Sequence, residues 1–210
     1  MSIMLKTRSG GICLKADLYF DRIDFYKYLP KIDCRDCGFT CREFSEKLKM
    51  GYRAERCPYL TKREAEFINL AVEAKEFLNV PILQTTVKTK TGLVFSRRGA
   101  VTLITANYPY TQAAVSEVMI RAGIEFNMLI IDTEGYSVDM AVFLGYFSAE
   151  RIAEYIEELE KVDKRKIVIP GLAERFKDEI SEILGDVIVG PVCCAELPIF
   201  LLKNGLINNI

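Results

Sequence analysis

The stretch VTLITANYPYT (residues 101–111) runs from an apolar, β-branched segment into a small polar turn. The same order returns in NMLIIDTEGYS (127–137), KIVIPG (166–171) and DVIVGP (186–191). Short apolar runs bounded by turn residues are typical of strands buried on both faces. The expected strands are residues 82–87, 101–105, 127–132, 166–170 and 186–190.

Helical patterns fill the gaps between these runs. The expected helices are residues 111–122, 136–146, 148–161, 172–184 and 195–203. Strands that alternate with helices indicate a parallel sheet covered on both faces. We therefore predict an open, doubly wound, Rossmann-like α/β domain over residues 81–210.

The chain before this domain has a different character. Residues 1–60 are rich in charge and cysteine, and we expect them to form a small separate domain with short helices at 24–30 and 41–50. Thr61 and Glu64 form a capping-box pattern that opens a helix. Residues 61–80 are therefore predicted to be a stiff connector, with one apolar face and with Asn69 on the opposite, polar face.

Four cysteines in the first part have the spacing C-x2-C-x3-C-x15-C-P: Cys34, Cys37, Cys41 and Cys57. Three thiolates close together and a fourth next to proline are a common way to hold an iron–sulfur cluster, which favours [4Fe–4S]. Zinc remains the alternative, although structural zinc usually uses two separate C-x2-C knuckles. Unligated thiols are the third reading. A segment this small needs such a centre because its own core is limited.

Composition excludes several classes of function. The chain has 210 residues and no histidine, so Ser-His-Asp and Cys-His catalysis and histidine-ligated metals are excluded. With 28 basic against 29 acidic side chains and no basic run, nucleic acid is not the expected partner. The first twenty residues contain no signal-peptide core, and no apolar stretch reaches membrane-spanning length. We expect a cytoplasmic protein without a membrane partner.

The loops after the predicted strands 101–105, 127–132, 166–170 and 186–190 are expected to meet at one edge of the sheet, where an open α/β domain binds its ligand. Small or polar residues in these loops are the candidate ligand contacts: Thr105, Asn107, Thr111, Thr133, Gly135, Ser137, Gly171 and Gly190. No G-x-G-x-x-G or P-loop follows a strand, so a large and mostly uncharged ligand is favoured. The alternative is that these residues form ordinary turns and helix caps.

Further chemistry-bearing residues lie at the same edge. Cys193 and Cys194 precede a predicted helix, whose N-terminus favours a thiolate that could act as a ligand or a redox group. The alternative is that both are small packing residues. Asp132 and Glu134 flank Thr133, and the following Gly135 makes a turn a better interpretation than an acid–base pair.

Two groups of motifs, in order along the chain, resemble the large (gamma) subunit family of corrinoid iron–sulfur proteins of the acetyl-CoA synthase/decarbonylase system. One is YKYLPKIDCRDCGFTCREFSEKLKMGYRAERCPYL (26–60), and the other runs from TLITANYPYT through IIDTEGYSVDMAV and IVIPG to VIVGP. The resemblance implies that Cys34, Cys37, Cys41 and Cys57 hold a [4Fe–4S] cluster. It maps these residues to the corrinoid-facing loops: Thr105, Asn107, Thr111, Asp132, Thr133, Glu134 and Gly135.

Two departures from this family stand out. Its cysteine run usually reads C-x2-C-x4-C, one residue longer than here. The family also has a (β/α)8 barrel between head and tail, where this sequence has only residues 61–80. The contacts that such a barrel supplies are therefore not carried over. TANYPYT contains no cysteine, which argues against a thiolate on cobalt from this loop.

The resemblance implies a corrinoid-binding [4Fe–4S] protein that acts in methyl transfer and in low-potential electron transfer to cobalt. With no histidine available, the corrinoid would be His-off. Implied partners are a methyltransferase or another protein that caps the cobalt, and a redox donor such as ferredoxin. One alternative is an electron-transfer or activator module for a separate corrinoid methyltransferase, without stoichiometric corrinoid of its own. Another is a zinc-stapled small-molecule binding protein.

Overall fold

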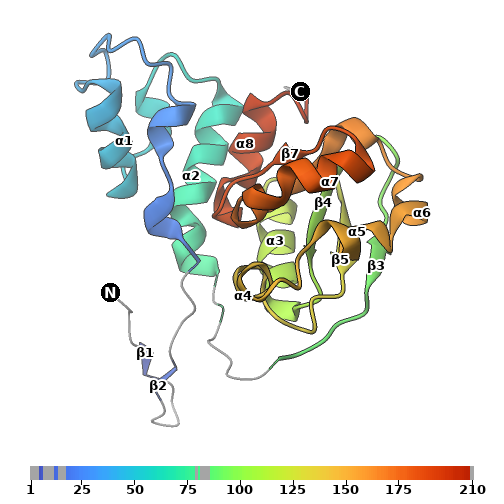
Figure 1. The fold of residues 1–210 in the computed structure, drawn as a ribbon. Helices are drawn as coiled ribbons and strands as arrows, with labels where there is room; N and C mark the ends of the chain where they lie inside the picture. Colours follow the sequence, from blue (N-terminus) through green and yellow to red (C-terminus); the bar gives the residue numbers. More distant parts are fainter. Residues whose placement is uncertain (1–4, 7–11, 14–17, 79, 81–85, 209–210) are drawn as a thin grey trace.

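The computed structural model describes residues 5–6, 12–13, 18–78, 80 and 86–208. Its main feature is a five-stranded sheet of order β3-β5-β4-β6-β7 within these residues (Figure 1). The strands are β3 (Gly92–Val94), β4 (Val101–Ala106), β5 (Phe126–Ile131), β6 (Ile167–Ile169) and β7 (Ile188–Val189). The last four are parallel, and β3 runs antiparallel to β5 at one edge.

The four parallel strands are confirmed within one or two residues of the predicted bounds. The predicted strand at 82–87 is not: residues 82–85 lie outside the described residues, and residues 86–87 are not in a strand. There the chain packs as a loop on the sheet edge, where the Val87 amide donates to the Gly135 carbonyl. The fifth strand is instead β3, which is too short and too exposed to give a sequence signal.

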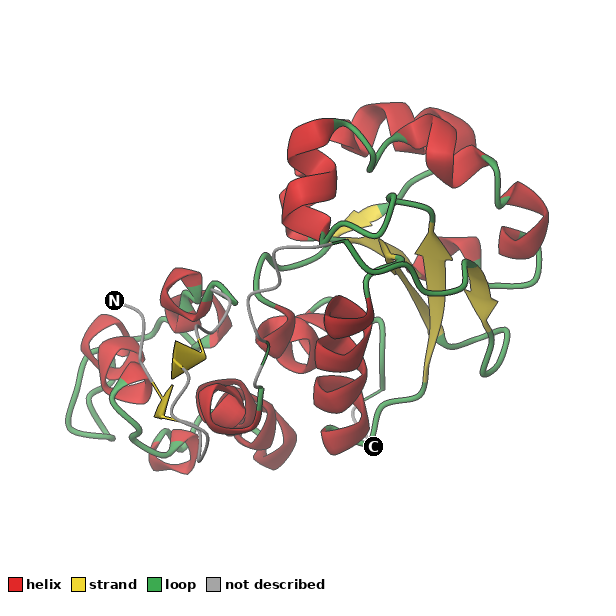
Figure 2. Ribbon diagram, turned by 90° about the horizontal axis from the view of Figure 1, so that it is seen from below, coloured by secondary structure: helices red, strands yellow, loops and turns green. Residues whose placement is uncertain are grey.

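Helices cover both faces of the sheet, as the doubly wound prediction requires (Figure 2). One face carries α3 (Pro109–Arg121), α8 (Leu197–Lys203) and α2 (Lys62–Phe77). The other carries α4 (Val138–Leu144), α5 (Ala149–Ala153), α6 (Ile156–Leu159) and α7 (Lys177–Leu184). Adjacent residues of β4 divide between the two cores, because Leu103 joins the first and Ile104 the second.

Three predicted helices differ in detail from those observed. The helix expected over 148–161 is broken into α5 and α6. Short 3-10 turns, η5 (Gly171–Phe176) and η6 (Cys194–Glu196), precede α7 and α8. Within the described residues, no helix has the length and apolar character needed to cross a membrane.

The cysteine-bearing head is built from short elements: η1 (Phe20–Arg22), η2 (Phe25–Tyr28), α1 (Cys41–Lys49) and η3 (Ala54–Arg56). Earlier in the chain, β1 (Leu5–Lys6) and β2 (Ile12–Cys13) form a separate antiparallel pair. Thr40 and Glu43 form a capping box at the start of α1. The capping box predicted for Thr61 and Glu64 is confirmed at the start of α2.

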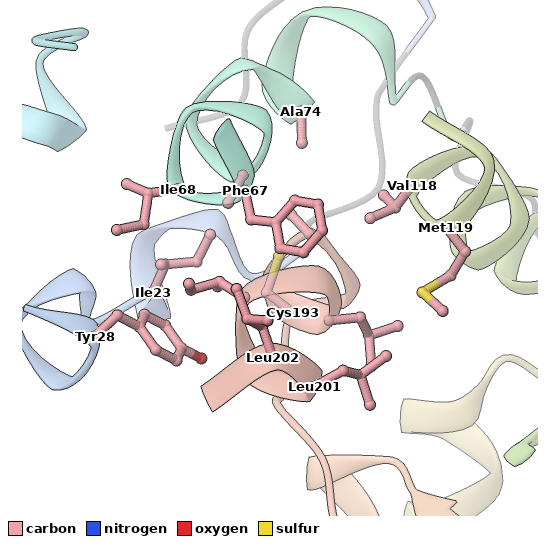
Figure 3. Close-up of a cluster of buried hydrophobic side chains, with 14 of the residues drawn as sticks. Ile23, Tyr28, Phe67, Ile68, Ala74, Val118, Met119, Cys193, Leu201 and Leu202 are labelled. Atoms are coloured by element: carbon pink, nitrogen blue, oxygen red, sulfur yellow. The ribbon is translucent and has the colours of Figure 1, made fainter. Parts of the chain in front are cut away.

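Helix α2 lies in the middle of a core that the head and the sheet share. Head side chains such as Ile23 and Tyr28 lie in the same buried cluster as Phe67 of α2 and Leu201 of α8 (Figure 3). This helix is therefore buried on more than the one face that the sequence predicts. The cysteine-bearing segment gains stability from this shared core, in addition to any metal centre that it holds.

Asn69 shows where the prediction for α2 was wrong. Its side chain was placed on the polar face, but it is only 4% exposed. The Asn69 Oδ1 accepts from the Ala54 amide at 2.9 Å, and its Nδ2 donates to Glu55 Oε1 at 2.8 Å. The Asn69 side chain thus holds η3 against α2, and η3 leads directly into Cys57.

A buried carboxylate also joins the head to the sheet. The Tyr28 hydroxyl donates to Glu196 Oε2 at 2.9 Å across 168 residues of sequence, and Lys27 pairs with the same oxygen. Glu196 is 2% exposed, so its charge depends on these two partners. Burial, followed by the charge of Glu196, raises the pKa of Tyr28 above its ordinary value, which keeps Tyr28 a donor.

Replacing Asn69 with Ala should lower the free energy of unfolding by about 1 to 3 kcal/mol, because the buried Ala54 amide loses its acceptor. Urea unfolding followed by circular dichroism measures this change. The matched control is Asn204→Ala, which removes an exposed amide bonded to the Phe200 carbonyl and should cost less than about 0.5 kcal/mol. Equal costs for the two variants would contradict the role given to Asn69.

Candidate functional site

A cavity of about 190 Å³ lies at the carboxyl ends of β4 and β6. The connection after β4 runs through α3 on one face, and the connection after β6 runs through η5 and α7 on the other. Neighbouring strands whose connections leave on opposite faces open a crevice at that edge, which is the usual ligand site of a doubly wound sheet. The cavity occupies this crevice.

Four of the predicted contact residues line the cavity: Thr105, Thr111, Ser137 and Gly190. Thr105 is 2% exposed, and its buried Oγ1 has no hydrogen-bond partner within the described part of the chain. Most of the remaining wall is apolar, with Leu103, Val115 and Val168 among its members. An unpaired buried hydroxyl costs free energy, so a ligand polar group that reached Thr105 would be favoured.

Asn107, Thr133 and Gly135 are brought together, but they bond to one another. The Asn107 Oδ1 accepts from the amides of Thr133 and Gly135, each at 3.0 Å, and from Thr133 Oγ1 at 2.9 Å. Its Nδ2 donates to Asp132 Oδ1 at 2.9 Å. None of these residues lines the cavity. In this structure, Asn107 holds the turn after β5 against the loop after β4.

The two acidic residues of that turn are held by cations. Lys88 Nζ lies 2.6 Å from Glu134 Oε2 and 3.8 Å from Asp132 Oδ1. The hydrogen bond to Glu134 raises the pKa of Lys88. Glu134 has φ 58° and Gly135 φ 75°, the geometry of a turn. Both carboxylates lie outside the cavity wall.

The two loop glycines allow close approach of the chain segments that follow β6 and β7. A Cβ on Gly171 would lie 2.6 Å from the Gly190 carbonyl oxygen, and one on Gly190 would lie 2.9 Å from Val168 Cγ1. Glycine is needed at both positions, because a Cβ on Gly171 would clash with the loop after β7 and a Cβ on Gly190 would clash with β6. Of the two, only Gly190 lines the cavity.

The cavity also has walls that sequence reasoning did not single out. Tyr19 and Asp139 line it, and the Tyr19 hydroxyl donates to Asp139 Oδ2 at 3.1 Å. Ser137, which the sequence did single out, lines the cavity and bonds to Asp139 Oδ1. No sequence signal identifies the Tyr19–Asp139 pair, because its members lie 120 residues apart.

The paired cysteines at this edge differ in position. Cys193 is fully buried in the core shared with α2, and Cys194 lines the cavity. Burial raises the pKa of the Cys194 thiol to about 12. Cys194 is therefore a neutral thiol at physiological pH, and the structure gives it the properties of an apolar wall residue.

At the end of α2 that lies away from the cavity, Cys34 and Cys37 lie on a loop of unusual backbone geometry, Cys41 begins α1, and Cys57 follows η3. Cys34 is exposed, Cys37 is half-buried, and Cys41 and Cys57 are buried. Left-handed φ angles recur in the loop between 31 and 38: 61° at Lys31, 47° at Asp33, 64° at Arg35 and 87° at Gly38. Such residues often turn backbone N–H groups toward an anionic centre. Non-glycine residues keep this strained conformation only where the surroundings require it.

Local contacts hold the loop in place. The Cys41 amide, at the start of α1, donates to Asp33 Oδ1 at 2.7 Å, and the Gly38 amide donates to the Arg35 carbonyl at 2.8 Å. The Tyr59 hydroxyl donates to Asp36 Oδ2 at 2.9 Å, which ties the segment after Cys57 back to the loop.

The donor set has the number and kind of ligands that a metal centre uses. Burial raises the pKa of the Cys57 thiol, and the charges of Cys37, Cys41 and Cys34 add to this rise, so the four cysteines lie near one another. Four thiolates suit a cluster, in which each binds a different iron, and they also suit a structural zinc ion.

Comparison with known proteins covers both sites. A family model described as the CO dehydrogenase/acetyl-CoA synthase delta subunit matches residues 76–201, and a model for an Fe-S cluster matches residues 29–59. The first match includes every strand of the five-stranded sheet and the cavity loops, and the second includes all four head cysteines.

Curated relatives carry related names. The gamma subunits of the acetyl-CoA decarbonylase/synthase complexes of Methanopyrus kandleri and Archaeoglobus fulgidus are 39% and 38% identical over 110 and 105 residues. The corrinoid/iron-sulfur protein large subunit of Moorella thermoacetica is 31% identical over 105 residues. These alignments cover 48–50% of this chain and 22–24% of the relatives.

The chain thus spans about a quarter of the length of the relatives that it matches. The delta-subunit model, in contrast, extends over more than half of this chain and over the whole sheet. The chain belongs to the CO dehydrogenase/acetyl-CoA synthase delta subunit family.

Proposed function

We propose that this chain is a corrinoid-binding iron–sulfur protein that acts in methyl-group transfer and in low-potential electron transfer to cobalt. In this proposal, residues 1–60 form the cluster domain, residues 61–80 the connecting helix, and residues 81–210 the corrinoid-binding domain. Cys34, Cys37, Cys41 and Cys57 hold a [4Fe–4S] cluster. When bound, the cluster supplies single electrons at low potential, and the corrinoid supplies a cobalt centre for one-carbon chemistry.

The observation that carries the corrinoid assignment is the unpaired Thr105 hydroxyl in an apolar cavity at the switch point of the sheet. Such a site binds a large ligand through apolar contact and orients it with few polar groups. The cavity is much smaller than a corrin ring, so only one part of the ligand would enter it. The names of the gamma-subunit and corrinoid/iron-sulfur relatives support the same ligand class.

The residues proposed to meet this ligand fall into two groups. Thr105, Thr111 and Gly190 form the wall itself. The others shape or flank the edge: Asn107, Asp132, Thr133, Glu134, Gly135 and Gly171. In this group Asn107 acts as the organising residue, because its amide joins the loops after β4 and β5.

The cobalt in this proposal is His-off, because the chain has no histidine. Cys194, the cysteine that lines the cavity, is also a poor metal donor, since a thiol of pKa about 12 is protonated at neutral pH. The lack of a strong protein ligand on the cobalt would make a bound corrinoid easier to reduce. The proposed partners are a methyltransferase or another protein that caps the cobalt, and a redox donor such as ferredoxin.

A second function is favoured by the separation of the two sites. Cys57 precedes the first turn of α2, and the cavity wall residue Val80 follows its last turn. At about 1.5 Å per residue, the 16 residues of α2 span about 24 Å. A cluster this far from the cavity suits an activator module that reduces the cobalt of a separate methyltransferase and binds no stoichiometric corrinoid itself.

Replacing Cys37 with Ala should abolish the broad absorbance at about 400 nm of anaerobically reconstituted protein, because one iron loses its thiolate. Iron and sulfide analysis checks the same point. The control Cys194→Ala removes a cysteine outside the proposed ligand set and should retain the full band. A complete cluster in the Cys37 variant would contradict the ligand assignment.

Thr105→Val should weaken binding of hydroxocobalamin by about three- to tenfold, since the ligand loses one hydrogen bond. The free energy of unfolding should not fall and should rise by up to about 1 to 3 kcal/mol, because the variant removes a buried hydroxyl that has no partner among the described residues. Spectrophotometric titration after removal of unbound corrinoid measures the affinity.

The matched control for Thr105 is Thr102→Val on the same strand. Thr102 Oγ1 accepts from Asn127 Nδ2 at 3.3 Å, so this variant should lose stability and keep its corrinoid affinity. Unchanged affinity in the Thr105 variant would move the ligand away from this cavity. A cluster band without any retained corrinoid in wild-type protein would favour the activator function.

Cys194 should react with iodoacetamide about a thousandfold more slowly than an ordinary cysteine at pH 8, since its pKa of about 12 leaves few thiolates. Because the thiolate is the reactive form, the rate should rise about tenfold per pH unit. Peptide mapping by mass spectrometry measures the rate, and urea-unfolded protein is the control. Fast alkylation of the folded protein at pH 8 would mean that a thiolate is available to the ligand.

A further inference from the structure

The cavity is closed in part by residues that do not belong to the sheet domain. Leu18 and Tyr19 lie where the described chain enters the head, and Val80 follows α2. Val80 lies two residues beyond the C-cap of α2, at the end of that helix away from Cys57. The walls of the sheet-edge cavity therefore include two residues of the head and the residue that follows the connecting helix.

Tyr19 is held at this place by specific contacts. Its hydroxyl donates to Asp139 Oδ2 at 3.1 Å, and the Arg22 guanidinium lies 5.1 Å from the centre of its ring. Its backbone has φ 61°, a left-handed conformation that a bulky side chain adopts only when its surroundings impose it.

The backbone of Tyr19 is linked directly to the head. The Tyr19 carbonyl accepts from the Arg22 amide at 3.0 Å, and the Phe20 carbonyl accepts from the Ile23 amide at 3.2 Å. Ile23 is 2% exposed in the core that the head shares with α2. A displacement of Tyr19 would therefore disturb η1 and reach this core.

Asp139 Oδ2, the oxygen that accepts the Tyr19 hydroxyl, could also accept a hydrogen bond from the proposed ligand. Asp139 Oδ1 already receives the Ser137 hydroxyl, whereas Oδ2 receives Tyr19. If Tyr19 moved away, Oδ2 would become a charged acceptor at the cavity wall. Such a group favours an N–H donor, and the edge of a corrin ring carries carboxamides that supply one.

We infer that Tyr19 gates the cavity: a carboxamide-bearing ligand displaces the Tyr19 hydroxyl from Asp139 Oδ2, takes its place, and thereby shifts the segment that leads into the cysteine-bearing head. Tyr19 is in this sense a positioning residue that couples the two sites, and Asp139 is a ligand contact. The ligand class rests on the function proposed above.

The test uses Tyr19→Phe, which keeps the ring and removes only the hydroxyl. If the hydrogen bond holds the gate closed, its loss raises the open fraction and with it the association rate. We expect stopped-flow association of hydroxocobalamin to be about three- to tenfold faster than in wild type, from the free energy of one hydrogen bond. Asp139→Ala should weaken binding, because the ligand loses its acceptor.

Hydrogen exchange of the free protein provides a readout that needs no ligand. The amides of Arg22 and Ile23 should exchange faster in Tyr19→Phe, because their acceptors lie in the released segment. The matched control is Tyr59→Phe, which also removes a hydroxyl bonded to a carboxylate, that of Asp36, but does not line the cavity or belong to the shared core. This control should change neither the association rate nor exchange at these two amides.

Different failures have different meanings. Slower association or weaker binding in Tyr19→Phe, with unchanged exchange, would make Tyr19 a simple ligand contact and overturn the gate. Equal association rates in wild type and variant would overturn it as well. If wild-type protein binds no hydroxocobalamin, the proposed function fails, and exchange at Arg22 and Ile23 alone decides whether Tyr19 holds the segment.

Discussion

The packing of α2 between the head and the sheet is the constraint on which the rest of the structure depends. Its side chains Phe67 and Ile68 share one buried cluster with Ile23 of the head and Leu201 of α8. A head of this size has little interior of its own, so docking on α2 supplies apolar burial that it otherwise lacks. The buried Glu196, bonded to Tyr28 and Lys27, then specifies how the two parts meet, since a misdocked head would leave its charge unpaired.

That docking places the two candidate sites at opposite ends of one helix. The cysteine loop lies near the start of α2, and the cavity wall includes Val80 beyond its end. The cavity wall nevertheless includes Tyr19, whose backbone continues into the head. Distance alone would make the two sites independent, but this connection gives ligand binding at the sheet edge a physical route to the head.

At the sheet edge, polar residues divide into those that build the turn and those that face the cavity. Asn107 Oδ1 accepts from the amides of Thr133 and Gly135 and from the Thr133 hydroxyl, so it serves the turn. Thr105, two residues earlier, lines the cavity, and its hydroxyl has no hydrogen-bond partner among the described residues. One loop thus provides both the rigid support and the polar group that a preformed ligand site needs.

The sequence by itself determined the four parallel strands, the capping box of α2, and the proximity of the head cysteines, because each depends on residues close together in the chain. It also placed the polar loops at one edge, since parallel strands end there together. Only the tertiary structure decided that Asn69 is buried, that β3 completes the sheet, and that Asn107 faces Thr133 while Thr105 faces a cavity. The Tyr28–Glu196 and Tyr19–Asp139 bonds join residues 168 and 120 positions apart, and such pairings follow from how the elements pack, which no local pattern encodes.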